Sequence, residues 1–277
     1  MIDLHLHTTA SDGQLPPADL VQRVAAAGIR TMSVTDHDTV AGLAEARAAA
    51  VRVDLEMVDG IEITAVHEGR DVHILGYYID TTGPALSTFL RAQRASRVER
   101  VFEIGEKLNA LGVGVDIDDL LESAASRLGA SVGRPSIARA MVDAGHVTTV
   151  QDAFDRYLAL GQPAFVPRRG QSPRDVVEVI HLAGGIASMA HPGVTRQPAL
   201  LGALVDAGLD GVEVYHSDHA PAVRAELSVF AARHRLLVTG GSDFHGDDGR
   251  ARPLGGITLP SADFERLRDA ATRRRTS

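Results

Sequence analysis

Apolar and polar positions follow two different periods along most of this chain. Short apolar runs of strand length cover residues 2–6, 30–35 and 55–63, while helix-like patterns of spaced apolar residues cover 16–28 and 40–51. A proline pair opens the first helical pattern and a glycine closes it, as expected at helix boundaries. Strands that alternate with helices predict an α/β fold with mainly parallel strands arranged as a barrel.

A hairpin and three later strands complete the predicted sheet. Residues 72–79 are strand-like and can pair with 55–63 across the turn Glu68-Gly69-Arg70. Three further strand-like runs, each preceded by a helical stretch, lie at 186–190, 211–215 and 236–239.

The middle of the chain interrupts this alternation. Residues 83–163 are almost wholly helical, with an Arg- and Glu-rich face that is typical of a solvated helix. We therefore predict a barrel formed by residues 1–82 and 164–277, with residues 83–163 as a helical insertion.

Composition excludes several classes of protein. The chain has 277 residues, of which 44% are hydrophobic and 23% charged, as in globular proteins in general. No apolar stretch approaches the ~18 residues needed to span a bilayer, and the N-terminus lacks the features of a secretion signal, so we expect a cytoplasmic monomer without membrane contact. A net charge of −8 argues against duplex DNA as a partner but not against a small phosphorylated ligand. The absence of cysteine leaves nitrogen and oxygen ligands for any metal.

Histidine and carboxylate residues recur where predicted strands end. Side chains at i and i+2 of a strand share a face, so His5 and His7 can bind one ion together. The same spacing recurs at Asp243 and His245. The candidate metal ligands are His5, His7, Asp12, His37, Glu62, His73, His191, Asp243 and His245.

Each of these residues also has an ordinary structural explanation. A single histidine is more often a hydrogen-bonded structural residue, a lone H-x-H pair is a weak motif, Glu62 could face solvent and Asp243 could belong to a turn. Their shared position decides between the interpretations. The carboxyl ends of parallel barrel strands converge on one face, where such folds hold their active sites. We therefore predict a metal centre.

The number of ligands indicates more than one ion. An ion that keeps an open position takes three or four protein ligands, so nine suit two or three ions with a carboxylate such as Glu62 as a bridge. Imidazole mixed with carboxylate favours Mn²⁺, Zn²⁺ or Fe²⁺ over Mg²⁺ or Ca²⁺.

The ordered set of motifs resembles the PHP (polymerase and histidinol phosphatase) family over nearly the whole chain. The motifs are His5-x-His7 with Thr8–Gly13, Thr35-Asp36-His37-Asp38, Gly60-x-Glu62, His73, Ala190-His191-Pro192 and Gly241-Ser242-Asp243-x-His245. Within the family the chain is most similar to phosphoesterases that remove a phosphate from nucleoside 3′,5′-bisphosphates, a branch in which some members trim short RNAs from the 5′ end. The resemblance implies a distorted (β/α)₇ barrel, a trinuclear site, and a helical insertion that bears on it through residues 133–139.

One residue departs from the family pattern. Relatives commonly carry histidine two positions after Arg134, where this chain has Ser136. If that histidine holds the phosphate or protonates the leaving group, its replacement affects substrate preference and rate.

These inferences lead to a working hypothesis for individual roles. Arg134 is the first candidate for neutralising the phosphoryl oxygens, followed by Arg168 and Arg169. His216, at another strand end, is a candidate general acid or substrate contact, and Asp36 either orients a neighbouring ligand or is an exposed turn residue. The ions are assigned as follows: His5, His7, Glu62 and Asp243 hold one, His73 and His191 hold a second bridged by Glu62, and Asp12, His37 and His245 hold a third.

Three functions remain to be weighed. A nucleotide phosphatase and a histidinol-phosphate phosphatase would use the same ligand set, although segments 8–13 and 133–139 favour the nucleotide substrate. A non-catalytic PHP module that supports a polymerase would tend to lose ligands and to belong to a much longer chain. The filled ligand positions therefore favour an enzyme, a metal-dependent phosphoesterase.

Overall fold

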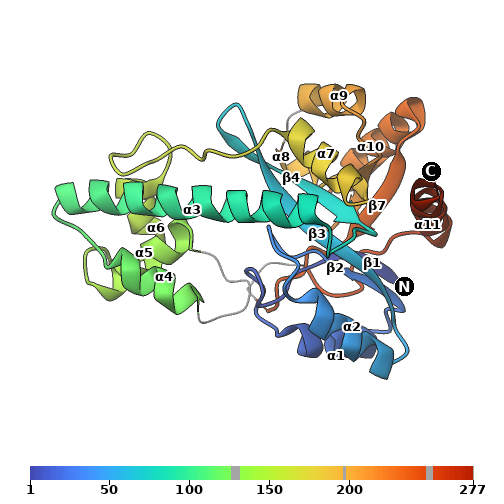
Figure 1. Ribbon diagram of the computed structural model, residues 1–277, viewed down its shortest axis with the longest axis horizontal. Helices are drawn as coiled ribbons and strands as arrows, with labels where there is room; N and C mark the ends of the chain where they lie inside the picture. Colours follow the sequence, from blue (N-terminus) through green and yellow to red (C-terminus); the bar gives the residue numbers. More distant parts are fainter. Residues whose placement is uncertain (126–131, 196–197, 248–251, 277) are drawn as a thin grey trace.

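A seven-stranded sheet forms the centre of the protein, and its strands lie in chain order (Figure 1). The computed structural model describes residues 1–125, 132–195, 198–247 and 252–276. The strands are β1 (Ile2–Leu6), β2 (Thr31–Val34), β3 (Glu56–His67), β4 (Arg70–Tyr77), β5 (Ile186–Met189), β6 (Gly211–His216) and β7 (Leu237–Gly241). Strands β1 to β3 are parallel, β4 is antiparallel to both of its neighbours, and β5 to β7 are parallel.

The two edges of the sheet approach each other where β7 ends. Leu6 forms a parallel bridge with Phe244, and the backbone N–H of Asp243 donates to the carbonyl of His5 at 2.9 Å. A Cβ on Gly241 would lie 2.3 Å from the backbone nitrogen of His5, so the close approach depends on glycine at this position. The sheet is therefore nearly closed, which confirms the predicted distorted seven-stranded α/β barrel.

The predicted hairpin is the antiparallel part of the barrel. Strands β3 and β4 pair from Gly60 opposite Tyr77 to His67 opposite Arg70, so both strands extend closer to the turn than the pattern indicated. In this register Thr64 lies opposite His73. Residues i and i+2 share a face, and this places His73 on the same face of the sheet as Glu62.

Helices surround the barrel and cover it with apolar side chains. One core cluster joins the first two helices to β1 and β2, a second lies between the sheet and the helices around β5 and β6, and a third lies under the C-terminal helix. These helices are α1 (Pro17–Ala26), α2 (Leu43–Arg52), α7 (Pro173–Leu182), α8 (Pro192–Thr195), α9 (Pro198–Asp206), α10 (Pro221–His234) and α11 (Ser261–Arg275).

Further helices lie between β4 and β5 and have a core cluster of their own. They are α3 (Pro84–Ala110), α4 (Ile117–Ala125), α5 (Arg134–Asp143), α6 (Val150–Ala153) and the π-helix η1 (Phe154–Leu158). In Figure 1, α3 runs outward from the barrel and the shorter helices lie beside its far half. The division of the chain at residues 83 and 163 stays a prediction. The helices in the described part of the chain are all too short or too polar to span a bilayer.

Candidate metal centre

The nine predicted ligands meet at one end of the barrel. Glu62 and His73 lie within the hairpin strands β3 and β4, and the others lie at strand ends or on the loops that follow them. Eight of them fall into three overlapping groups, within each of which one ligand atom per residue lies within 4.8 Å of the others. His191 joins them through its Nε2, which lies 3.1 Å from Glu62 Oε1. The groups are His5, His7, Glu62 and Asp243; His37, Glu62 and His73; and His7, Asp12, His37 and His245.

Glu62 lies at the centre of the cluster, and its two oxygens face different histidines. Oε2 is 3.2 Å from the Nε2 atoms of both His5 and His7. Oε1 is 2.8 Å from His73 Nδ1 and 3.1 Å from His191 Nε2. The side chain is fully buried, so its position is set by these neighbours. A carboxylate with one oxygen on each side is the arrangement that a bridge between two ions requires.

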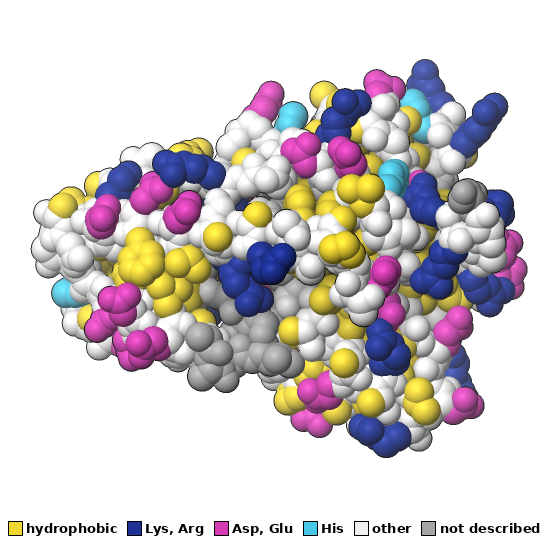
Figure 2. Space-filling view, viewed as in Figure 1, with side chains coloured by type: hydrophobic (Ala, Val, Ile, Leu, Met, Phe, Trp, Pro, Cys, Tyr) yellow, Lys and Arg dark blue, Asp and Glu magenta, His cyan; other side chains and the backbone are white. Residues whose placement is uncertain are grey.

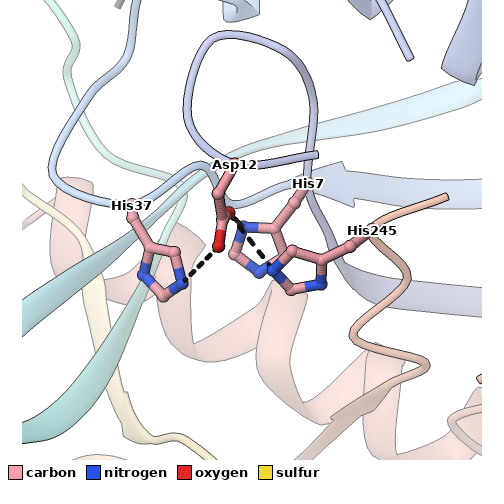
Figure 3. Close-up of side chains that lie close together, drawn as sticks. All are labelled: His7, Asp12, His37 and His245. Carbon is pink, nitrogen blue, oxygen red and sulfur yellow. Dashed lines mark ion pairs between the residues drawn. The ribbon is translucent and has the colours of Figure 1, made fainter. Parts of the chain in front are cut away.

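Two aspartates lie at the edge of the cluster that is formed by His5 and His7. Asp243 Oδ1 lies 3.4 Å from His5 Nε2 and 3.2 Å from His7 Nε2. Asp12 Oδ1 lies 3.2 Å from His245 Nε2 and its Oδ2 lies 4.0 Å from His37 Nε2 (Figure 3). The Asp12 side chain is 55% exposed whereas that of Asp243 is 7% exposed, so the centre meets solvent at Asp12.

Unpartnered ring nitrogens show that this donor set suits metal ions. Among the described residues, both ring nitrogens of His7 and the Nδ1 atoms of His37 and His73 are buried without an aligned hydrogen bond. They nevertheless lie close to carboxylate oxygens. Ligand atoms that share an ion at about 2.0–2.2 Å are themselves ~3.0–3.5 Å apart. The spacing and the missing hydrogen bonds are therefore both explained by ions between these atoms, and the residues fit a divalent metal.

The carboxylates and imidazoles also alter one another's protonation. Burial alone would lower the pKa of His7, but the close carboxylates of Asp243 and Glu62 outweigh it and raise the pKa to about 10. Burial would raise the pKa of Glu62, but the charge of the surrounding histidines holds it well below its usual range. In the ion-free protein, His7 therefore carries a proton at neutral pH, and the paired charges substitute for the metal.

Metal binding should consequently weaken as the pH falls. The raised pKa of His7 keeps its ring protonated below about pH 10, and an ion must displace that proton to bind Nε2. For each proton displaced, the apparent affinity should fall about tenfold per pH unit. Calorimetric titration of ion-free protein with Mn²⁺, in buffers of different ionisation enthalpy, measures the released protons. An affinity that stays constant between about pH 6 and pH 9 would contradict this description.

Asp36 organises the loop that carries Asp12. Its Oδ1 accepts hydrogen bonds from the backbone N–H of Thr8 at 2.7 Å and from Ser11 Oγ at 2.7 Å, and its Oδ2 accepts one from Thr8 Oγ1 at 2.6 Å. The side chain is buried. These contacts support the orienting role considered for Asp36, and the ligand it positions is Asp12, through residues 8–11, more directly than His37.

Strand β6 contributes two buried side chains beside the ligands. Glu213 Oε1 lies 2.9 Å from His5 Nδ1, and His216 Nε2 lies 3.2 Å from Asp243 Oδ2. His216 Nδ1 also accepts the backbone N–H of Asp218 at 3.1 Å. Both ring nitrogens of His216 are thus engaged and the residue is fully buried. This geometry favours a positioning role over the general-acid role, which stays a prediction. Glu213 is not among the residues with a role predicted from the sequence, although its place at a strand end was the available signal.

The candidate arginines lie between the barrel and the helices that follow β4. The Arg134 guanidinium donates to the Leu158 carbonyl at 3.3 Å and lies 5.6 Å from the centre of the Phe165 ring. Arg168 donates to Asp38 Oδ2 at 3.3 Å. Arg169 pairs instead with Glu103, and its side chain is 69% exposed.

Histidines outside the ligand set have other partners. His146 and His219 bond to the backbone carbonyls of Gly114 and Val214, and His181 pairs with Asp210. Besides these and His216, the histidines outside the set are the partly buried His67 and the exposed His234.

The fold and this centre define a class of enzyme, and comparison with known proteins agrees. The family model "PHP domain" matches residues 3–161, and the chain belongs to the PHP family. It is a metal-dependent hydrolase of phosphoesters.

Relatives at moderate identity cover almost the whole chain. The 5′-3′ exoribonuclease of Haemophilus influenzae is 38% identical over 248 residues, which cover 88% of this chain and 89% of the relative. The 3′,5′-nucleoside bisphosphate phosphatase of Chromobacterium violaceum is 36% identical over 256 residues, covering 90% and 89%. A crystal structure from Bifidobacterium adolescentis, assigned as a metal-dependent phosphoesterase, matches with a TM-score of 0.82 and 34% identity and covers 96% of this chain and 94% of its own.

Proposed function

We propose that this enzyme removes the 3′-phosphate from nucleoside 3′,5′-bisphosphates and that short RNA with a 5′-phosphate is a second substrate. The names of the two curated relatives support a nucleotide substrate. The observation that carries the proposal is a group of arginines beside the metal centre, because a bisphosphate needs a second place for negative charge. The enzyme would act as a cytoplasmic monomer, on small substrates rather than duplex DNA.

The arginine cluster consists of four guanidinium groups from three parts of the chain: Arg97 and Arg100 on α3, Arg134 on α5, and Arg168 in the segment before α7. Arg97 and Arg168 both donate to Asp38 Oδ2. Burial, together with the nearby charges of Arg134 and Arg168, lowers the pKa of Arg100 to about 10. Figure 2 shows Lys and Arg side chains gathered near the middle of the visible face, between the outer helices and the barrel.

The positive charge of this cluster is only partly offset by carboxylates. Asp38 and Asp71 both pair with Arg168, and Asp38 also pairs with Arg97. Arg100 and Arg134 donate to backbone carbonyls, which carry no net charge. Guanidinium groups in a half-buried site bind phosphate strongly because charge-assisted hydrogen bonds gain strength away from bulk water.

The arginine cluster adjoins the metal centre through Asp38. This residue follows His37 in the chain, and its backbone N–H donates to the Glu62 carbonyl at 2.9 Å. Its Oδ1 accepts the backbone N–H of Thr64 at 2.8 Å, and Thr64 lies opposite His73 in the hairpin. A substrate with one phosphate at the metal centre can therefore place a second phosphate against the arginines.

The metal centre would hold two or three ions of Mn²⁺, Zn²⁺ or Fe²⁺, with Glu62 as the bridge. When bound, such ions lower the pKa of water toward neutrality and neutralise the phosphoryl oxygens. His5, His7 and Asp243 would lie on one side of Glu62, with His73 and His191 on the other. Asp12, His37 and His245 would hold the third ion. Ser136 on α5 offers a hydroxyl but no acid, so the leaving group would receive its proton from another source.

Histidinol phosphate is the alternative substrate for the same metal centre. Its amino group is positively charged at neutral pH, and the arginine cluster would repel it. The cluster therefore favours the bisphosphate over this alternative.

Phosphate release from Mn²⁺-loaded protein, and release of nucleoside 5′-monophosphate from the RNA dimer, tests the substrate. Adenosine 3′,5′-bisphosphate, adenosine 3′-monophosphate, histidinol phosphate and a 5′-phosphorylated RNA dimer are compared at equal concentration. We expect the bisphosphate to have the highest kcat/KM, because it alone offers a phosphate monoester to each site. The RNA dimer should react more slowly, because its phosphate at the metal centre is a diester. Faster turnover of histidinol phosphate or of the 3′-monophosphate would overturn the proposed substrate while leaving the metal chemistry intact.

A further inference from the structure

Glu213 on β6 has its whole carboxylate committed to two predicted metal ligands. Oε1 lies 2.9 Å from His5 Nδ1, and Oε2 accepts the backbone N–H of His191 at 2.7 Å. The side chain is fully buried. Strands β5 and β6 are parallel neighbours, which fixes Glu213 relative to the loop that carries His191.

The contact with His5 determines which ring nitrogen is free for a metal. A carboxylate accepts hydrogen bonds, so His5 Nδ1 carries the proton that it donates to Glu213. His5 Nε2, which lies 3.2 Å from Glu62 Oε2 and 3.4 Å from Asp243 Oδ1, then presents its lone pair to the cluster. A carboxylate behind a metal-binding imidazole fixes its tautomer and orientation in this way.

Glu213 could instead be a metal ligand, since it forms a possible metal-binding group with His5 and His216. The hydrogen bonds argue against this. His5 Nδ1, both Glu213 oxygens and both His216 nitrogens have hydrogen-bond partners. In the main cluster, both ring nitrogens of His7 and the Nδ1 atoms of His37 and His73 lack such partners. To bind there, an ion would have to displace hydrogen bonds that these donor atoms already form.

We propose that Glu213 is a positioning residue that holds the His5 tautomer and the His191 backbone so that both imidazoles bind metal. This inference rests on the proposed metal centre but not on the identity of the substrate. His216 holds Asp243 Oδ2 in a parallel manner, so β6 supports three ligands without supplying one.

Glu213→Gln tests the proposal because glutamine has the size of glutamate but replaces one of its two acceptor oxygens with an NH₂ donor. If the amide oxygen remains against the His191 N–H, the amide NH₂ faces His5 and forces the proton onto Nε2. The affinity for Mn²⁺ and Zn²⁺, measured by competition with a chelator, should fall about 10- to 100-fold, as is usual when such a partner is lost. Glu226→Gln, an exposed change on α10, is the matched control and should bind metal like the parent protein.

Several outcomes are distinguishable without any substrate. A folded Glu213→Gln protein with parental metal affinity would overturn the proposal, and so would loss of one whole ion with the remaining affinity unchanged, since that identifies Glu213 as a ligand. If Glu213→Gln fails to fold, Glu213→Asp replaces it. The shorter carboxylate cannot reach both partners, and parental metal affinity in that variant would overturn the proposal.

In folded variants, nitrogen-15 spectra of the Zn²⁺-loaded protein should show an altered His5 ring signature. Since no phosphoester is used, failure here would leave the proposed substrate untouched.

Discussion

Glu62→Gln should abolish metal-dependent phosphoester hydrolysis. The carboxylate faces His5 and His7 through one oxygen and His73 and His191 through the other. Glutamine presents one oxygen and a hydrogen-bond donor, so one of the two sides loses its acceptor. Loss of a single group that stabilises a transition state costs about 10²–10³ in kcat, and loss of bound metal should bring the decrease to at least about 10³-fold. Phosphate release and bound metal are measured on the same preparations.

Glu56→Gln is the control for this change. Glu56 is an exposed residue on the same strand, and its carboxylate accepts a hydrogen bond from Thr31. The control should keep metal and activity. If Glu62→Gln retains both the parental metal content and the parental kcat, Glu62 is not a bridge and the arrangement of the centre is wrong.

Arg168→Ala should weaken binding of substrates that carry a second phosphate. Its guanidinium belongs to the arginine cluster and is held by Asp38 and Asp71. A hydrogen bond to a charged group contributes about 1.5–3 kcal/mol, which corresponds to about a 10- to 100-fold rise in KM. The rise should appear with adenosine 3′,5′-bisphosphate and be small with adenosine 3′-monophosphate.

The next residue provides the control. Arg169 is exposed and pairs with Glu103, so Arg169→Ala removes the same charge without altering the cluster. Its KM for both substrates should stay near the parental value. Equal effects of the two substitutions, or an equal effect of Arg168→Ala on both substrates, would show that the cluster does not recognise a second phosphate.

The grouping of the candidate ligands was predictable because strand periodicity and local spacing define it. His5 and His7 share a strand, Asp243 and His245 share a loop, and the barrel brings both places to one end. The number of ions could not be derived in this way. His7 and His37 each turn one ring nitrogen toward Glu62 and the other toward Asp12, so one histidine can belong to either neighbouring group.

Contacts between segments that are distant in the chain could not be predicted from the sequence. Arg97 and Asp38 are 59 positions apart, and their pairing depends on how α3 packs against the barrel. Arg97 was therefore treated as part of a solvated helix face. Glu213 and His5 are 208 positions apart. Nothing in the sequence around a glutamate at a strand end indicates that it hydrogen-bonds to a metal-binding histidine on another strand. Periodicity places a residue on a face, whereas tertiary packing decides which side chain it meets.

The most direct test of a multi-ion phosphoesterase is to add metal back to stripped protein in measured steps. Protein freed of metal by a chelator is titrated with Mn²⁺, and bound metal and phosphate release from adenosine 3′,5′-bisphosphate are recorded at each step. A Glu62-bridged centre predicts almost no activity with one ion bound and a steep rise as the second binds. Full activity in the stripped protein, or full activity with a single bound ion, would contradict it.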